Sequence, residues 1–297
     1  MLGPGGVHMN DNLHEIERII DYIEAHLLEE KLDLDTVSQE IGYSKYHLHR
    51  MFTSVVGLTF HHYLQRRRLT EAARMLVFTD KPIIEIALCA GYDTQQSFSR
   101  GFKDMFRHSP TFFRKHRDFI PLQLKYDISN REKLRGDMIT DVKTVEEDAI
   151  YLIGYSGSTK NGFHIIGRCW RLLHKNKYKI ENRTDRKFLI GVNDYSMFDN
   201  EGNKPVFTYI AATQVNSLKS MPNGMKAFTL PSSRYVVFYF KGKNEGSLQP
   251  VVEYIYREWF PNSTCVFNES NLYDFVKYGE DVDENGESEI QFWVPVV

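Results

Sequence analysis

Three features are scarce in this chain of 297 residues: cysteine, long apolar segments and an excess of charge of one sign. The three cysteines, Cys89, Cys169 and Cys265, are far apart, so their spacing matches neither a zinc site nor a disulfide framework. No apolar run approaches the roughly 20 residues that a membrane span needs, and the N-terminus lacks the apolar core of a signal peptide. These absences predict a protein of the reducing cytoplasm with no cofactor, no metal site and no membrane partner.

The net charge is −2, which by itself would argue against binding to nucleic acid. The distribution of charge argues the other way, because residues 41–118 carry thirteen Lys and Arg but six Asp and Glu. Screening at physiological salt limits the reach of a charge to about 8 Å, so local charge decides whether phosphate groups are attracted. The basic segment lies between acidic segments at residues 11–40 and 280–289.

Residues 34–117 contain one pattern twice. In each copy a short helix with apolar periodicity ends at a glycine, Gly42 or Gly91, and a second helix follows a polar residue that can cap it. This order is typical of the helix-turn-helix unit. Matched positions differ by 49 residues up to the Gly-Tyr pair and by 50 after it, and they are Leu34/Ile83, Val37/Ile86, Gly42/Gly91, Tyr43/Tyr92, Arg50/Arg100, Phe52/Phe102, Tyr63/Phe113 and Arg67/Arg117.

The N-terminal half of the chain is predicted to be all helical. Helices are expected at residues 12–30, 34–41, 44–56, 59–78, 83–90, 95–107 and 111–117, with Pro82 at the first position of the fifth helix.

The second helix of each unit is the expected recognition helix. Arginine can bind guanine through O6 and N7, and glutamine can bind adenine through N6 and N7. The exposed face of the first recognition helix is expected to offer Tyr46, His49 and Arg50, and that of the second Gln96, Ser97, Ser99 and Arg100.

Basic residues around these faces are expected to hold phosphates, namely Lys45, Arg67 and Lys103. Arg67 is the centre of the run Arg66-Arg67-Arg68 in the long helix 59–78. Two readings stay open for this run: it clamps phosphate, or one or two of the three arginines face solvent or pair with Glu71.

Residues 12–118 closely resemble the AraC/XylS family of transcription regulators. The resemblance rests on Ile41–Ser44, Leu48–Phe52 and Gly57 in the first unit, and on Ile83–Ala87, Ala90–Tyr92, Phe98–Lys103 and Ser109–Arg114 in the second. It implies two helix-turn-helix units joined by a long helix, and base contacts from the two faces named above. The stretch Gln95–Arg100 is close to the Rob/MarA/SoxS group, whereas Tyr46 and His49 stand where that group has Trp and Gln. A different target sequence is therefore expected.

The character of the sequence changes after Ile120-Pro121. Residues 121–137 are polar and are interpreted as a linker. Strands are expected at 142–145, 149–155, 188–192, 207–212, 227–230, 235–240 and 290–297, and helices at 165–174 and 248–259. The segments Tyr151–Gly157 and Tyr235–Gly242 look like copies of each other. Each half then has the order strand, strand, helix, strand, strand, which predicts two pseudosymmetric α+β halves with a cleft between them.

Residues 138–297 resemble the GyrI-like effector-binding domain, through Arg234–Gly242, Glu258–Ser263 and Ile290–Pro295. The resemblance implies an aromatic cleft for lipophilic, often cationic, small molecules, with an acid near its floor. Asp274 takes the place of the family's glutamate, and this shorter acid puts a cationic ligand in doubt. The expected ligand-binding residues are Asp274, Trp170, Tyr151, Tyr209, Phe228 and Trp293, and each aromatic one is alternatively a core residue.

The sequence thus predicts a multidomain protein: an expression scar at 1–9, an AraC-type tandem helix-turn-helix domain at 10–120, a linker at 121–137 and a GyrI-like domain at 138–297. It is expected to be a cytoplasmic regulator, not an enzyme, that binds double-stranded DNA at an asymmetric operator, senses a small lipophilic or aromatic effector and contacts RNA polymerase. Two alternatives stay open. One is a constitutive DNA-binding regulator whose C-terminal domain binds a partner. The other is a GyrI-like hydrolase fused to a DNA-binding domain, although the sequence has no Ser-His-Asp or metal constellation.

Overall fold

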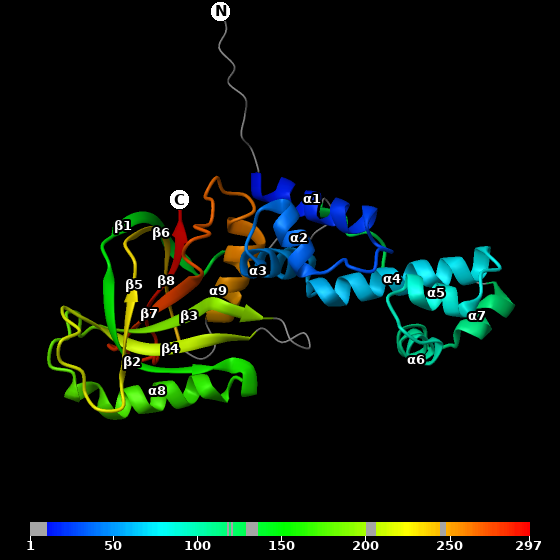
Figure 1. Cartoon of the computed structure of the whole chain (residues 1–297). Helices are drawn as coiled ribbons and strands as arrows, with labels where there is room; N and C mark the ends of the chain where they lie inside the picture. The colour runs from blue at the N-terminus through cyan, green and yellow to red at the C-terminus, as the bar shows by residue number, and fades with distance from the viewer. Residues whose placement is uncertain (1–10, 118, 120, 129–135, 200–205, 244–247) are drawn as a thin grey trace, which may run out of the picture. The chain divides into compact units, whose positions relative to one another are not determined.

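The computed structural model describes residues 11–117, 119, 121–128, 136–199, 206–243 and 248–297 (Figure 1). They fall into two compact units, one within residues 10–132 and one within residues 133–297. Residues 1–9, interpreted above as an expression scar, lie outside the described part. None of the described helices is both long enough and apolar enough to cross a membrane.

The described part of the N-terminal unit is helical, as predicted. Its helices are α1 (Asp11–Ala25), α2 (Leu34–Ile41), α3 (Lys45–Val56), α4 (Phe60–Phe78), α5 (Ile83–Cys89), α6 (Gln95–Phe106) and α7 (Pro110–His116). The first ends five residues earlier than expected. Pro82 precedes α5 as its N-cap residue instead of occupying its first turn, so that detail of the prediction is wrong.

Local capping explains where the recognition helices begin. The Ser44 hydroxyl accepts a hydrogen bond from the His47 backbone N–H at 3.3 Å, and the Thr94 hydroxyl accepts one from the Ser97 N–H at 3.1 Å. Each cap satisfies a backbone donor that the first helical turn leaves unpaired. At the end of α2, Gly42 has a φ of 81°, a left-handed conformation that glycine adopts without strain.

The two helix-turn-helix copies share one scaffold contact. The rings of Phe52 and Tyr63 meet edge to face with centroids 5.5 Å apart, and those of Phe102 and Phe113 do so at 5.1 Å. Each of these rings is buried. Phe52 corresponds to Phe102 and Tyr63 to Phe113 in the sequence repeat. The repeat is therefore a repeat of packing, which fixes each recognition helix against the helix that follows it.

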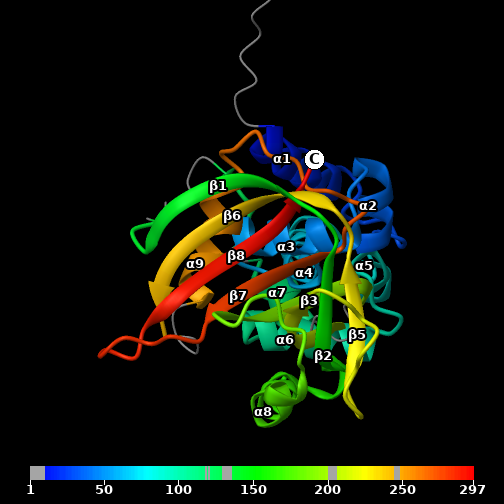
Figure 2. The same cartoon turned by 90° about the vertical axis from the view of Figure 1, so that its left-hand side faces the viewer.

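The C-terminal unit is built on an eight-stranded antiparallel sheet. Its strands are β1 (Ile139–Glu147), β2 (Ile150–Ser158), β3 (Phe188–Asp199), β4 (Val206–Val215), β5 (Lys226–Leu230), β6 (Ser233–Gly242), β7 (Tyr273–Gly279) and β8 (Ser288–Val296). They lie side by side in the order β1-β6-β8-β7-β3-β4-β2-β5 (Figure 2).

This order shows the predicted pseudosymmetry. The strands of the first half, β1 to β4, correspond to β5 to β8 of the second half. When each strand is replaced by its counterpart, the order reads β5-β2-β4-β3-β7-β8-β6-β1, which is the original order in reverse. A two-fold axis between the central strands β3 and β7 has this effect. The outermost strand of each half pairs with the other half, β1 with β6 and β5 with β2, so the two halves are interlocked.

Two helices cover one face of the sheet: α8 (His164–Asn176) contacts β2 and β4, and α9 (Leu248–Tyr254) continues into the π-helical turn η5 (Ile255–Trp259). In η5, the Tyr256 ring meets Phe292 of β8, and Trp259 meets Phe238 of β6. The opposite face carries an apolar cluster that includes Tyr235, Phe275 and Trp293.

Candidate functional site

The recognition face of α6 is open in the structure. Gln96, Ser97 and Arg100 are exposed and Ser99 is half-buried. Phe98, Phe102 and Phe106 bury the other side of the helix. The exposed donors and acceptors are thus held in fixed order along one side of a capped helix. Such a face can meet base edges in a major groove.

The matched face of α3 differs in exposure from what was expected. Tyr46 and His49 are only 4% and 8% exposed, so they do not form an open face in this structure. Leu48, Met51 and Val55 lie at helical spacing on another side of α3 and are buried too. Tyr46 and His49 stay predicted base contacts.

Arg50 is positioned by its own helix. Its Nη1 donates a hydrogen bond of 2.6 Å to the Tyr46 hydroxyl one turn earlier, and its guanidinium carbon lies 5.8 Å from the Tyr46 ring centroid. Burial, followed by the charge of Arg50, lowers the pKa of His49 to about 4. The imidazole is therefore neutral at pH 7, with one nitrogen that donates and one that accepts.

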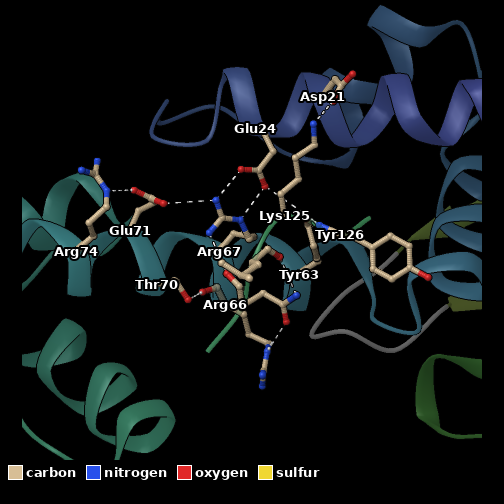
Figure 3. A network of polar contacts seen from close by, with 12 residues as sticks. Asp21, Glu24, Tyr63, Arg66, Arg67, Thr70, Glu71, Arg74, Lys125 and Tyr126 are labelled. Atoms are coloured by element: carbon tan, nitrogen blue, oxygen red, sulfur yellow. Dashed lines mark hydrogen bonds and ion pairs between the residues drawn. The ribbon is translucent and has the colours of Figure 1, made fainter. Parts of the chain in front are cut away.

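Arg67, expected to contact phosphate, is paired with protein carboxylates in the structure (Figure 3). Its Nη2 lies 2.6 Å from Glu24 Oε2 and its Nε donates to Glu24 Oε1 at 2.8 Å, which makes a two-pronged ion pair between α4 and α1. Glu71 Oε1 is 3.5 Å from the same Nη2. The Arg67 side chain is 8% exposed, so the group is held inside the helical unit.

The neighbours of Arg67 are also engaged by protein. Arg66 donates to Gln123 Oε1 at 3.1 Å, and Arg68 donates to the backbone carbonyls of Leu27, at 2.7 Å, and Glu29. The contacts of this arginine run in the structure are with protein groups, and Glu71, which was expected as a partner, is one of them. Lys45 also has an acidic partner, Asp35, whereas Lys103 is exposed.

Residues 122–126, which begin the expected linker, are fastened to the helical unit. The Arg67 Nη1 donates to the Gln123 carbonyl at 3.0 Å, and Lys125 pairs with Asp21 of α1. The Tyr126 N–H donates to the Tyr63 hydroxyl at 3.0 Å, and the Tyr126 hydroxyl donates to the Val55 carbonyl at 2.7 Å. This segment therefore ties α1, α3 and α4 together; Figure 3 shows its contacts with α1 and α4.

A cavity of about 970 Å³ lies along α8 in the C-terminal unit. It is lined by residues of both halves: Ile166, Gly167, Trp170, Arg171, His174, Lys177, Leu189, Tyr209, Tyr278, Gly279, Glu280 and Val282. Small-molecule sites are commonly about 300–1,000 Å³ and carry aromatic walls with a few polar groups. The volume and the lining both fit that description.

Trp170, Tyr209 and Tyr278 form the aromatic wall of this cavity. Trp170 Nε1 donates to the Tyr209 hydroxyl at 2.8 Å, and its ring meets Tyr278 edge to face at 5.3 Å. Two of these three residues were expected from the sequence and Tyr278 was missed. Its place in the stretch Asp274–Tyr278 was the available signal, because residues 274, 276 and 278 of a strand share one face.

The Trp170–Tyr209 contact depends on a glycine beneath it. A Cβ atom on Gly191 of β3 would lie 2.4 Å from the Tyr209 hydroxyl oxygen and 3.1 Å from a ring carbon of Trp170. Both distances are shorter than van der Waals contact. The missing side chain in β3 therefore lets both rings lie close over the sheet.

Asp274 lies on the same face of the sheet as this wall but does not line the cavity. Its side chain is fully buried, and Asn193 Nδ2 donates to its Oδ1 at 2.7 Å. The hydroxyls of Tyr195 and Tyr256 donate to Oδ2 at 3.4 and 3.3 Å. In this arrangement the carboxylate is used by the protein itself.

Three expected ligand residues lie elsewhere. Trp293 stacks on Phe275, with centroids 5.2 Å apart, in the apolar cluster on the opposite face of the sheet, and Phe228 packs against that cluster. Tyr151 is 40% exposed and lines none of this cavity. The packing of Trp293 and Phe228 in this cluster fits their alternative reading as core residues. Sequence reasoning placed aromatics in strands but could not tell which face each would occupy.

Comparison with known protein families gives two adjacent matches. Residues 37–116 match a family described as helix-turn-helix domain, and residues 143–296 match one described as integron-associated effector binding protein. The second match covers more than half of the chain.

Individual relatives match the N-terminal third. The transposon Tn10 TetD protein of Escherichia coli is 42% identical over 102 residues, which are 34% of this chain and 73% of TetD. The right origin-binding protein of Escherichia coli strain K12 is 41% identical over 100 residues, 34% of each chain. For the C-terminal unit, the crystal structure of an integron cassette protein from the mobile metagenome of Vibrio cholerae covers 54% of this chain and 97% of its own, with 14% identity and a TM-score of 0.40.

Proposed function

The chain belongs to the integron-associated effector binding family through its C-terminal unit and is an AraC-type DNA-binding regulator through its N-terminal third, and from this we propose that it couples sequence-specific DNA binding to the sensing of a small lipophilic or aromatic molecule. The observation that carries the DNA-binding part is the duplicated helix pair. Its two copies share the contacts Phe52–Tyr63 and Phe102–Phe113 but differ on the recognition faces.

On α6 the proposed base-contacting residues are Gln96, Ser97, Ser99 and Arg100, and on α3 they are Tyr46, His49 and Arg50. Arg100 carries most weight because it is exposed and has the geometry for a bidentate contact with guanine. Lys45 and Lys103 are proposed to contact phosphates, which fix register without reading sequence. On α3 the Arg50 guanidinium is held by the Tyr46 hydroxyl of its own helix.

The DNA-binding proposal is tested by separating specific from non-specific affinity. Arg50→Ala and Arg100→Ala should each weaken binding to a selected operator by about tenfold to a hundredfold, the cost of one lost bidentate base contact. Binding to random duplex at the same salt should change far less. Arg74→Ala is the matched control, because Arg74 is a half-exposed arginine of α4 that pairs with Glu71. If both recognition variants footprint like the parent, the assignment of the recognition helices is wrong.

The sensing part of the proposal is carried by the cavity along α8, with its wall of Trp170, Tyr209 and Tyr278. An aromatic ligand can gain both apolar burial and edge-to-face contacts there. The full chain should be stabilised against heat by a two-ring aromatic compound, and Trp170→Ala should abolish that shift. A panel of aromatic compounds without any stabilising effect would contradict sensing at this cavity.

A further inference from the structure

The charges around the α8 cavity are unevenly distributed. Three basic side chains line it, Arg171, His174 and Lys177, against one carboxylate, Glu280. Both oxygens of that carboxylate are in use: Lys177 Nζ pairs with Oε1, and Arg183 Nη2 lies 2.7 Å from Oε2. Two cations thus share one anion, and Arg171 adds a further positive charge.

The hydroxyl groups of Tyr209 and Tyr278 add no negative charge to the cavity. Burial raises the pKa of Tyr209 well above 10 and also raises that of Tyr278. Both hydroxyls therefore stay protonated at neutral pH. Tyr209 accepts a hydrogen bond from Trp170, whose indole N–H can only donate. The aromatic wall is polar but uncharged.

The acid expected to hold a cationic ligand, Asp274, is already engaged by protein groups. Asp274 is fully buried and accepts hydrogen bonds from Asn193, Tyr195 and Tyr256. A cation in the cavity would face Arg171 and Lys177 while the one lining carboxylate is already paired. Since like charges repel and a partly enclosed site screens them less than water does, this arrangement disfavours a cation.

We propose that the cavity selects aromatic molecules that carry a negative charge, of the aromatic carboxylate class. The ring packs against Trp170 and Tyr278, and the carboxylate accepts hydrogen bonds from Arg171 and Lys177. A planar guanidinium matches a carboxylate with two parallel bonds, and such charge-assisted bonds are the strong ones. This inference rests on the proposed sensing function and names the ligand class of the same cavity.

Two probes with one ring system and opposite charge test this selectivity. Titration calorimetry of the full chain compares 2-naphthoate with the (2-naphthylmethyl)trimethylammonium ion. The parent should bind naphthoate at least about tenfold more tightly, as expected for one charge-assisted contact. Arg171→Glu should invert the preference, and Arg171→Gln should reduce it. Lys175→Glu makes the same charge change at an exposed position of α8 that does not line the cavity, and it should leave the preference unchanged.

The outcomes separate this inference from the function on which it rests. Tighter binding of the ammonium probe, with loss of that binding in Trp170→Ala, would overturn the charge selectivity and leave sensing at this cavity intact. Equal effects of Arg171→Glu and Lys175→Glu would overturn the role of Arg171, because a general surface charge would then explain the preference. If neither naphthyl probe binds and neither stabilises the protein, sensing at this cavity fails together with its selectivity.

Discussion

Arg67 shows how one side chain can look like a DNA contact in sequence and act as an internal tie in the structure. It lies in a run of three arginines, but its ion-pair partner Glu24 is 43 residues earlier in the chain. A buried or half-buried arginine loses its hydration shell and therefore needs a partner such as a carboxylate. The run as a whole holds α1, α4 and residues 122–126 together, which no local pattern in the sequence could reveal.

Arg67→Leu should therefore destabilise the helical unit and leave phosphate contacts alone. Leucine leaves Glu24 without its cation, and the expected loss is about 3 kcal/mol of unfolding free energy, near the lower limit for breaking a buried pair. Denaturant unfolding followed by circular dichroism measures it. Arg18→Leu is the control, since the Arg18–Glu15 pair is at the surface and should contribute about 0–1 kcal/mol. Unchanged stability together with a weaker salt dependence of DNA binding would instead identify Arg67 as a phosphate contact.

His174 should make the affinity for the proposed ligand depend on pH. Burial, followed by the charge of Lys177, lowers the pKa of this imidazole below its usual value of 6.5. The free protein should therefore lose stability as the pH falls through 6.5, because the folded state resists protonation. Arg171 and Lys177 add positive charge around the imidazole and Glu280 is the nearby acid. A bound carboxylate raises the pKa of His174, so ligand binding takes up a proton.

The affinity for 2-naphthoate should accordingly increase as the pH is lowered from about 7.5 to about 5.5, the range in which histidine titrates. Calorimetry at both pH values measures this increase, and proton uptake can be checked in buffers of different ionisation enthalpy. In His174→Gln the affinity should be nearly the same at both values. An affinity of the parent that falls with acidity would contradict the predicted linkage.

At the scale of elements, the position of α8 over the sheet depends on the absence of a side chain at Gly191 of β3. Gly191→Ala should push the Tyr209 ring of β4 and the Trp170 ring of α8 away from β3, because the new methyl group would lie 2.4 Å from the Tyr209 hydroxyl oxygen. We expect a loss of about 1–3 kcal/mol in stability, as for other overpacked sites, and a naphthoate affinity that is weaker by about tenfold. Gly167→Ala is the matched control for stability alone, because Gly167 lines the cavity next to Arg171. Its methyl group would meet Arg171 at an ordinary 3.5 Å within a helix, where alanine stabilises by about 0.5–1 kcal/mol. A similar loss of stability in the two variants would show that close approach at Gly191 is unimportant.

The elements that sequence predicts well are those with a strong period and a local stop. Helix α2 runs from Leu34 to Ile41, as predicted, because Asp33 caps it and Gly42 ends it. Strand β7 was missed, since Asp274 interrupts its apolar run and the hydrogen bonds that allow burial of this acid come from β3 and η5. The pseudosymmetric order of elements was visible in the repeated segments. The sequence did not show which face of the sheet each aromatic side chain occupies, because that depends on pairing between distant strands.

At the scale of the whole molecule, the two proposed recognition helices predict asymmetric DNA binding by a single chain. The two helix-turn-helix units share the contacts Phe52–Tyr63 and Phe102–Phe113, which hold α3 against α4 and α6 against α7. The faces themselves differ, with Tyr46, His49 and Arg50 on one and Gln96, Ser97, Ser99 and Arg100 on the other. If each proposed face reads its own half-site, the two half-sites differ in sequence. A palindromic operator needs two identical readers related by a two-fold axis.

Selection of bound fragments from random DNA by the full chain should therefore return a site without dyad symmetry, with two conserved segments roughly one helical turn apart. Repeating the selection with Arg50→Ala should relax the sequence of one segment, and with Arg100→Ala that of the other, each by about 1–3 kcal/mol of discrimination at the affected base pair. Arg74→Ala should return the parental site. Recovery of a palindrome, or relaxation of the same segment by both variants, would mean that α3 and α6 do not read DNA independently. The proposal that the duplicated helix pair reads two different half-sites would then be wrong.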